Sequence, residues 1–169
     1  MGETMTGHSM AISPFNSPLE TGIRSLGVLS SSYPQNFDLH RLVVFDHLVV
    51  HTGDLGGPAS LHPRLPLRSA ELLVRRALVE RGLMLMISRG LIERIVDEHG
   101  FSYRASELAE PFLGSLATEY MLALKERAEW VAANFCASSE DEIRQTMNTI
   151  FEQWVEQFHS AQNQSEANQ

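Results

Sequence analysis

The sequence predicts a mainly α fold: a winged helix-turn-helix core with a two-stranded wing, followed by a C-terminal helical arm. Three observations favour it. Apolar residues recur at helical spacing through most of the 169-residue chain. Two strand-like runs, 91–96 and 101–105, flank a turn at 97–100. Two helical stretches and a long one at 69–89 precede this hairpin, and a further helical pattern follows it. This order of elements is that of a winged helix-turn-helix domain.

The first two helices are predicted from their N-terminal signals. Ser17 is followed by Pro18 and by Glu20, which gives a cap, a proline at the first helical position and a glutamate placed to close a capping box. The resulting helix should end at a run of serines. Asp38 is expected to cap a second helix at 39–51, which is apolar all round and therefore largely buried.

The remaining helices are predicted from stripe and cap patterns. Gly82 should weaken the middle of the helix at 69–89, and the helix can divide in two at this position. After the wing, Ser106 is expected to cap a helix whose apolar stripe runs through Leu113, Leu116, Tyr120, Leu124 and Val131. Ser139 and Glu142 form a second capping box, which opens a last amphipathic helix carrying Ile143, Met147, Ile150, Trp154 and Phe158.

These elements divide the chain into four parts. Residues 1–16 are polar and without period, and we expect a flexible N-terminal lead-in. A winged-helix-like domain should occupy 17–135, a C-terminal amphipathic helical arm 138–160, and a disordered tail 161–169.

Composition excludes several classes of protein. No apolar run approaches the ~18 residues that a membrane span needs. The single cysteine, Cys136, excludes an internal disulfide framework and fits a reducing compartment. We therefore expect a cytoplasmic protein without a membrane partner.

Charge is unevenly distributed. Residues 1–106 hold ten bases and ten acids, whereas 107–169 hold eleven acids and three bases, so the whole net charge of −8 lies in the C-terminal third. Seven arginines against three glutamates make 64–94 locally basic. Its arginines are candidate DNA contacts or partners of nearby carboxylates, in particular Arg75, Arg76 and Arg89.

Catalysis is not predicted. His47 and His51 share a helix face, as metal ligands often do, but Leu48 stands where a zincin needs its glutamate. Helix-end capping and pairing with carboxylates are the preferred interpretation of these histidines. Cys136 has no adjacent base, and the glycines at 53–57 do not follow a strand. We predict no catalytic residues, metal or cofactor.

Two segments are candidate partner-binding sites. The loop at 52–68 is long for a small domain, and its prolines and glycines predict a rigid, exposed path. Aromatic residues on the arm can anchor a partner. The candidate residues are Asp54, Gly57, His62, Arg64 and Arg68 in the loop and Trp154 and Phe158 on the arm.

Several ordered segments resemble one family. They lie at 18–24, 37–43, 51–58, 60–63, 68–76, 88–92 and 127–131. Together these segments, within about residues 16–135, resemble the small middle component of bacterial ABC-three-component systems, a group that includes the Lamassu-type defence systems.

The resemblance implies a role that composition cannot show. Such systems combine an SMC-like ABC ATPase, a middle component and an effector, often a nuclease, in antiviral or anti-plasmid defence. The resemblance implies a non-catalytic adaptor that joins the ATPase to the effector and meets DNA through the complex. The alternatives from the residues alone are a winged-helix transcription regulator and, more distantly, a metal-dependent enzyme that uses His47 and His51.

Overall fold

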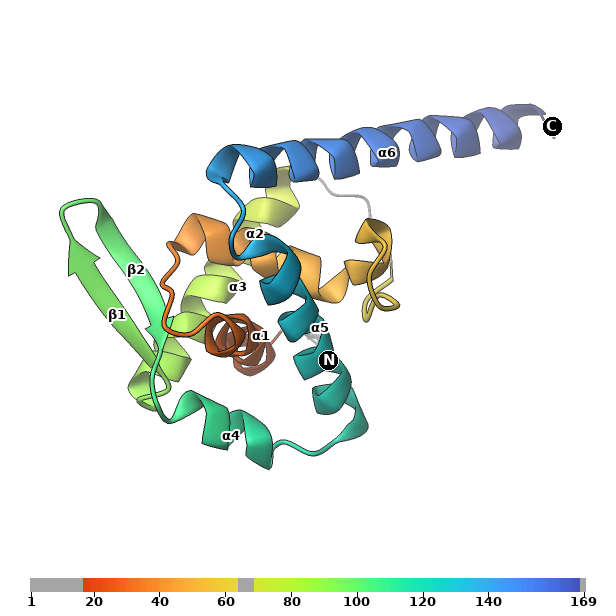
Figure 1. Ribbon diagram of the computed structural model, residues 1–169. Coiled ribbons are helices and arrows are strands. Elements are labelled where there is room, and N and C mark those ends of the chain that lie inside the picture. The colour runs from red at the N-terminus through yellow and green to blue at the C-terminus, as the bar shows by residue number, and fades with distance from the viewer. Residues whose placement is uncertain (1–16, 64–68, 168–169) are drawn as a thin grey trace, which may run out of the picture.

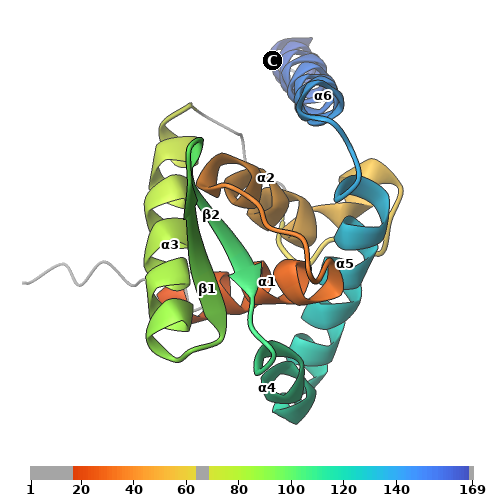
Figure 2. The ribbon, with the colours of Figure 1, turned by 60° about the vertical axis from the view of Figure 1, so that its left-hand side comes forward.

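The computed structural model describes residues 17–63 and 69–167, and the expected lead-in at 1–16 lies outside them. The fold is mainly helical with one two-stranded antiparallel sheet, as predicted (Figures 1 and 2). In chain order the elements are α1 (Pro18–Ser31), α2 (Leu39–Val50), the 3₁₀ turn η2 (Thr52–Leu55), α3 (Ser69–Ser88), β1 (Ile92–Asp97), β2 (Gly100–Ala105), α4 (Ala109–Ser115), α5 (Glu119–Phe135) and α6 (Glu140–Ala167).

The caps predicted at Ser17, Asp38 and Ser139 are present, whereas the one predicted at Ser106 is not. The next helix, α4, begins at Ala109, and Leu108 occupies its N-cap position without a side-chain cap. The side chain of Ser17 accepts a hydrogen bond from the Glu20 amide at 3.2 Å, and that of Asp38 accepts from the Arg41 amide at 2.8 Å. At the start of α6, the Ser139 amide donates to the Glu142 carboxylate and the Glu142 amide to the Ser139 hydroxyl, which completes the capping box. Local sequence therefore determines where these helices begin.

The wing pairs in a simple register, from Ile92 opposite Ala105 to Asp97 opposite Gly100. Phe37, between α1 and α2, adds one antiparallel bridge to the outer edge of β2 by exchanging two backbone hydrogen bonds with Tyr103. The wing is thereby tied to the turn that precedes α2 as well as to α3.

Three expectations about helices differ from the structure. The helix expected after Ser106 is two helices, because the chain breaks after Ser115 and Thr118 caps α5 through the Met121 amide. Gly82 does not divide α3. The last helix continues to Ala167, beyond the boundary expected at 160.

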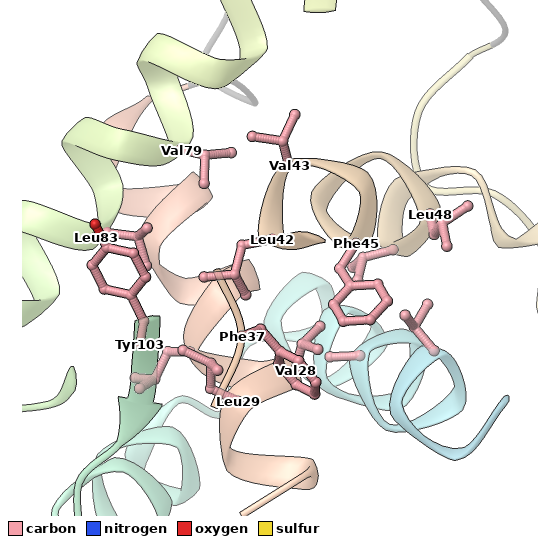
Figure 3. Close-up of a cluster of buried hydrophobic side chains, with 14 of the residues drawn as sticks. Val28, Leu29, Phe37, Leu42, Val43, Phe45, Leu48, Val79, Leu83 and Tyr103 are labelled. Atoms are coloured by element: carbon pink, nitrogen blue, oxygen red, sulfur yellow. The ribbon is translucent and has the colours of Figure 1, made fainter. Parts of the chain in front are cut away.

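The core lies where α1 meets α2, α3 and α5 (Figure 3). Leu26, Leu29, Phe45 and Leu48 are almost fully buried there. α1 is the central element, since its residues from Glu20 to Leu29 are all buried. Charged side chains on α1 must therefore find partners inside the protein.

α1 and α3 cross at a pair of glycines. A Cβ at Gly82 would lie 2.6 Å from the Gly22 nitrogen and 2.9 Å from the Pro18 carbonyl oxygen. Both distances are shorter than atoms tolerate, so the close approach of the two helices requires glycine at position 82. Gly82 is thus a packing residue of an unbroken helix.

In the described part of the chain, no helix is both long enough and apolar enough to cross a membrane.

Candidate functional site

A buried polar network joins α1, α2 and α3 at the centre of the molecule. The Arg24 Nε donates to Asp46 Oδ1 at 2.6 Å and its Nη2 to Oδ2 at 3.3 Å. Arg75 on α3 donates from Nη1 to the same Oδ2. The side chains of Arg24 and Asp46 are each 1% exposed. One carboxylate therefore holds two guanidinium groups from different helices.

The network extends to α5. Glu20 lies one turn before Arg24, with 3.7 Å between Oε1 and Nη1. The Tyr120 hydroxyl donates to that same Glu20 oxygen and lies 3.4 Å from Nε2 of His62. Burial raises the pKa of Tyr120 and the hydrogen bond to Glu20 adds to the increase, so the phenol stays protonated. The network thus joins α1, α2, α3 and α5 to one another and to the loop at 52–63.

Electrostatics keep the central pair ionised. Burial alone would raise the pKa of Asp46, but the guanidinium groups of Arg24 and Arg75 outweigh it and lower that pKa. For Arg24, burial alone would lower the pKa, and the attraction of Asp46 outweighs it and raises the pKa. Both groups remain charged at neutral pH.

Three histidines lie beside this network. The rings of His47 and His51 are 4.5 Å apart, and those of His51 and His62 are 6.4 Å apart. Burial lowers the pKa of His47 to about 3, and those of His51 and His62 to about 4; nearby positive groups act in the same direction. All three are therefore neutral at pH 7.

His51 stands at the C-terminal cap of α2, as expected of a helix-end histidine, whereas His47 lies inside that helix and does not pair with a carboxylate there. Both ring nitrogens of His47 and Nδ1 of His51 are buried without a hydrogen-bond partner among the described residues. Within residues 17–63 and 69–167, no group of three or more His, Cys, Asp or Glu side chains is placed to hold a metal ion.

The candidate loop packs against the body in its first half. The Thr52 hydroxyl donates to the Pro58 carbonyl at 2.7 Å, and the Arg127 Nε on α5 donates to the Ala59 carbonyl at 2.8 Å. A Cβ at Gly57 would lie 2.7 Å from the ring of Trp130, so the backbone there lies directly on that ring.

The candidate loop residues therefore have different surroundings. Gly57 is a packing position, His62 is partly buried beside Tyr120, and Asp54 is partly exposed. Substitution of His62 should consequently affect stability as well as any docking. Arg64 and Arg68 lie outside the described residues. Binding of a partner by this loop stays a prediction.

The three candidate DNA-contacting arginines also differ in their surroundings. Arg75 is held by Asp46, with its side chain 19% exposed, whereas Arg76 and Arg89 are exposed. The exposed side of α3 also carries Val74 and Met84, which are 61% and 55% exposed. This face combines arginines with apolar side chains.

Sequence reasoning missed a groove of about 640 Å³ between the tip of the wing, the start of α2 and α6. Val43 and Val44, Phe101, and Met147 and Phe151 form much of its apolar wall. Residues of α2 and α6, far apart in the chain, line this groove together. No local sequence pattern predicts that these two helices lie side by side.

Sequence reasoning also missed the two arginines that join helices. Arg24 could have been noticed as a charged residue one position after Ile23 in an apolar helix. Arg41 Nη2 donates to the Phe135, Cys136 and Ser138 carbonyls at the junction of α5 and α6. It thereby anchors the start of α6 to α2, and no sequence pattern indicated this contact.

α6 presents an acidic surface. Ile143, Met147 and Ile150 are buried against the body, while Glu152 and Glu156 are exposed. Trp154 and Phe158 belong to α6, but their side chains lie outside the described part of the chain. Their role as partner anchors stays a prediction.

Comparison with known proteins identifies the family. A family model described as ABC-three component (ABC-3C) system Middle Component 2 matches residues 14–157, which is most of the chain. The chain belongs to this family. No curated protein and no solved structure matches it.

Membership of the Middle Component 2 family confirms the resemblance found in the sequence. A middle component of a three-component system has other subunits as partners. The surfaces open to such subunits include the exposed face of α3, the groove beside the wing and the acidic α6.

Proposed function

We propose that this middle component is a non-catalytic adaptor that links an SMC-like ATPase to an effector nuclease in an anti-phage or anti-plasmid defence complex. The family match over residues 14–157 is the observation that carries the proposal. In this proposal the chain acts in the bacterial cytoplasm, catalyses no reaction itself and meets DNA through the complex. The central network of Arg24, Asp46 and Arg75 fits the non-catalytic part of the proposal, because these charged side chains bind one another and join three helices.

Co-expression tests the proposal. The tagged chain would be expressed together with the other two components of its own system and purified at physiological salt. We expect both components to be recovered with it, and ATP hydrolysis and nuclease activity to belong to those components. Recovery of the tagged chain alone, or either activity in the isolated chain, would contradict the adaptor proposal.

A winged-helix transcription regulator is the second candidate. It is favoured by one observation: the hairpin directly follows a long helix on which Arg76 is exposed, with Arg89 exposed just beyond its end. Against it, Arg75 is engaged by Asp46, and the same face exposes Val74 and Met84. Sequence-selective binding to its own upstream DNA, on the order of 10⁻⁸ M or tighter at physiological salt, would favour the regulator.

A further inference from the structure

The C-terminal helix extends beyond the part of the molecule that supports it. Among the described side chains of α6, the buried ones are Ile143, Met147 and Ile150, all in its first three turns. From Glu152 to Ala167 the helix runs on past α5 and the loop at 52–63 (Figure 1). A helical stretch of this length is marginal in water without tertiary packing.

The extended part of α6 carries negative charge that its own residues do not compensate. From position 145 to the end of the chain there is no Lys or Arg. Glu152 and Glu156 are exposed one turn apart, an arrangement that destabilises an isolated helix. Neither glutamate takes part in a salt bridge within the described residues, and the last turn lacks a base to offset the negative end of the helix dipole.

The negative charge of this part of α6 indicates which kind of partner can bind it. A second copy would bring another acidic α6, and nucleic acid or an anionic membrane surface would also present negative charge. A protein surface rich in Lys or Arg would compensate the glutamates and the helix end together. In the sequence, positions 154 and 158 continue the apolar spacing of 143, 147 and 150, which suits a helix that lies in an apolar groove.

We propose that α6 from Glu152 onward is a docking helix for an apolar groove rimmed by Lys or Arg on another protein component of the three-component system. The inference rests on the proposed adaptor function and adds the surface and the chemistry of its partner. Basic groups on the partner would also offset the repulsion between Glu152 and Glu156, so the helical conformation of α6 becomes more stable in the complex.

Charge reversal tests the inference in the full-length chain. The probe is the pair of other components, co-expressed with the tagged chain. Glu152→Lys with Glu156→Lys should weaken binding about tenfold or more, because attraction becomes repulsion on both residues. Glu152→Gln with Glu156→Gln should lose less. The matched control is Glu107→Lys with Glu129→Lys, at exposed positions before α4 and on α5, which changes net charge equally and should bind as the wild type does.

Two further measurements make the result decisive. A chain that ends after Phe151 retains the buried turns of α6 and should lose the complex while keeping its thermal midpoint. Binding of the wild type should weaken as salt rises, and this salt dependence should be lost in the reversed variant. Circular dichroism would verify that the lysine variants remain helical.

The possible failures are distinguishable. If the wild type forms no complex, the proposed function and this inference are both overturned. If the wild type forms the complex and the lysine variant binds equally well, the inference alone is overturned. A stable homodimer that is lost on truncation after Phe151 would assign α6 to a second copy and would also overturn it.

Discussion

At the scale of single residues, the Asp46 carboxylate accepts hydrogen bonds from two guanidinium groups that come from α1 and α3. Removing its charge takes from the buried Arg24 the carboxylate that accepts its Nε and Nη2 hydrogen bonds. Breaking a buried ion pair in this way costs about 3–5 kcal/mol. We therefore expect Asp46→Asn to lower the free energy of unfolding by about that amount, measured by urea denaturation.

An exposed ion pair provides the control. Arg104 donates to Glu93 on the wing at 2.8 Å, and both side chains face solvent to a large extent. Glu93→Gln should cost much less than Asp46→Asn, because an ion pair between solvent-exposed side chains contributes little to stability. Equal losses for the two variants would mean that the central network contributes little to stability.

The buried histidines predict that stability falls in mild acid. Their pKa values in the folded protein, about 3 for His47 and about 4 for His51, lie below the ordinary value of 6.5. The unfolded chain therefore binds more protons between these values, and the stability present above pH 6.5 is lost as pH falls toward 4. For His47 alone, the slope approaches about 1.4 kcal/mol per pH unit.

His47→Leu tests the assignment of this pH dependence. Urea denaturation at pH 7.5, 6 and 5 should show a shallower loss of stability for the variant than for the wild type. At pH 7.5 the variant should be close to the wild type in stability, because neither ring nitrogen of His47 has a partner among the described residues. An unchanged slope would assign the titration to other groups.

At the scale of elements, the crossing of α1 and α3 depends on the absence of a side chain at Gly82. Helix propensity alone predicts that Gly82→Ala stabilises α3 by about 1 kcal/mol. The contact with Gly22 predicts the opposite, since overpacking costs about 1–3 kcal/mol. We expect a net loss, measured as a lower thermal midpoint.

Gly114 in α4 is the matched control for this substitution. A Cβ there would meet no atom within 4 Å, so Gly114→Ala should leave the thermal midpoint unchanged or raise it slightly. If both alanine variants raised the midpoint, the close approach of α1 and α3 would not limit the packing.

The elements also show which sequence signals were reliable. Caps and periodicity predicted the starts of α1, α2 and α6 because a cap depends on residues within one turn. The same reasoning joined α4 to α5, since the stripe through Leu113 and Leu124 continues across the break. The Thr118 cap was the local signal that could have separated them.

At the scale of the whole molecule, the distribution of charge predicts weak DNA binding by the isolated chain. The net charge is −8, Arg75 is engaged by Asp46, and α6 is acidic. Binding should be independent of sequence, weaker than about 10⁻⁶ M at physiological salt and strongly salt-dependent.

Titrations with random and upstream duplexes at two salt concentrations measure this affinity. Arg76→Ala with Arg89→Ala should reduce the weak binding uniformly across sequences, as loss of phosphate contacts does. A selective loss on one duplex would instead indicate base reading and favour the regulator.

The sequence by itself determined the helical class, the wing, the helix starts, the charge asymmetry and the family, because these depend on residue types and short spacings. Tertiary structure alone decided that Arg24 and Arg75 meet at Asp46, that Gly22 meets Gly82, and that the loop at 52–63 rests on Trp130. Such contacts join residues far apart in the chain, so they depend on how whole helices orient as they bury their apolar faces. That orientation made Arg75 a structural residue and left Arg76 on the surface.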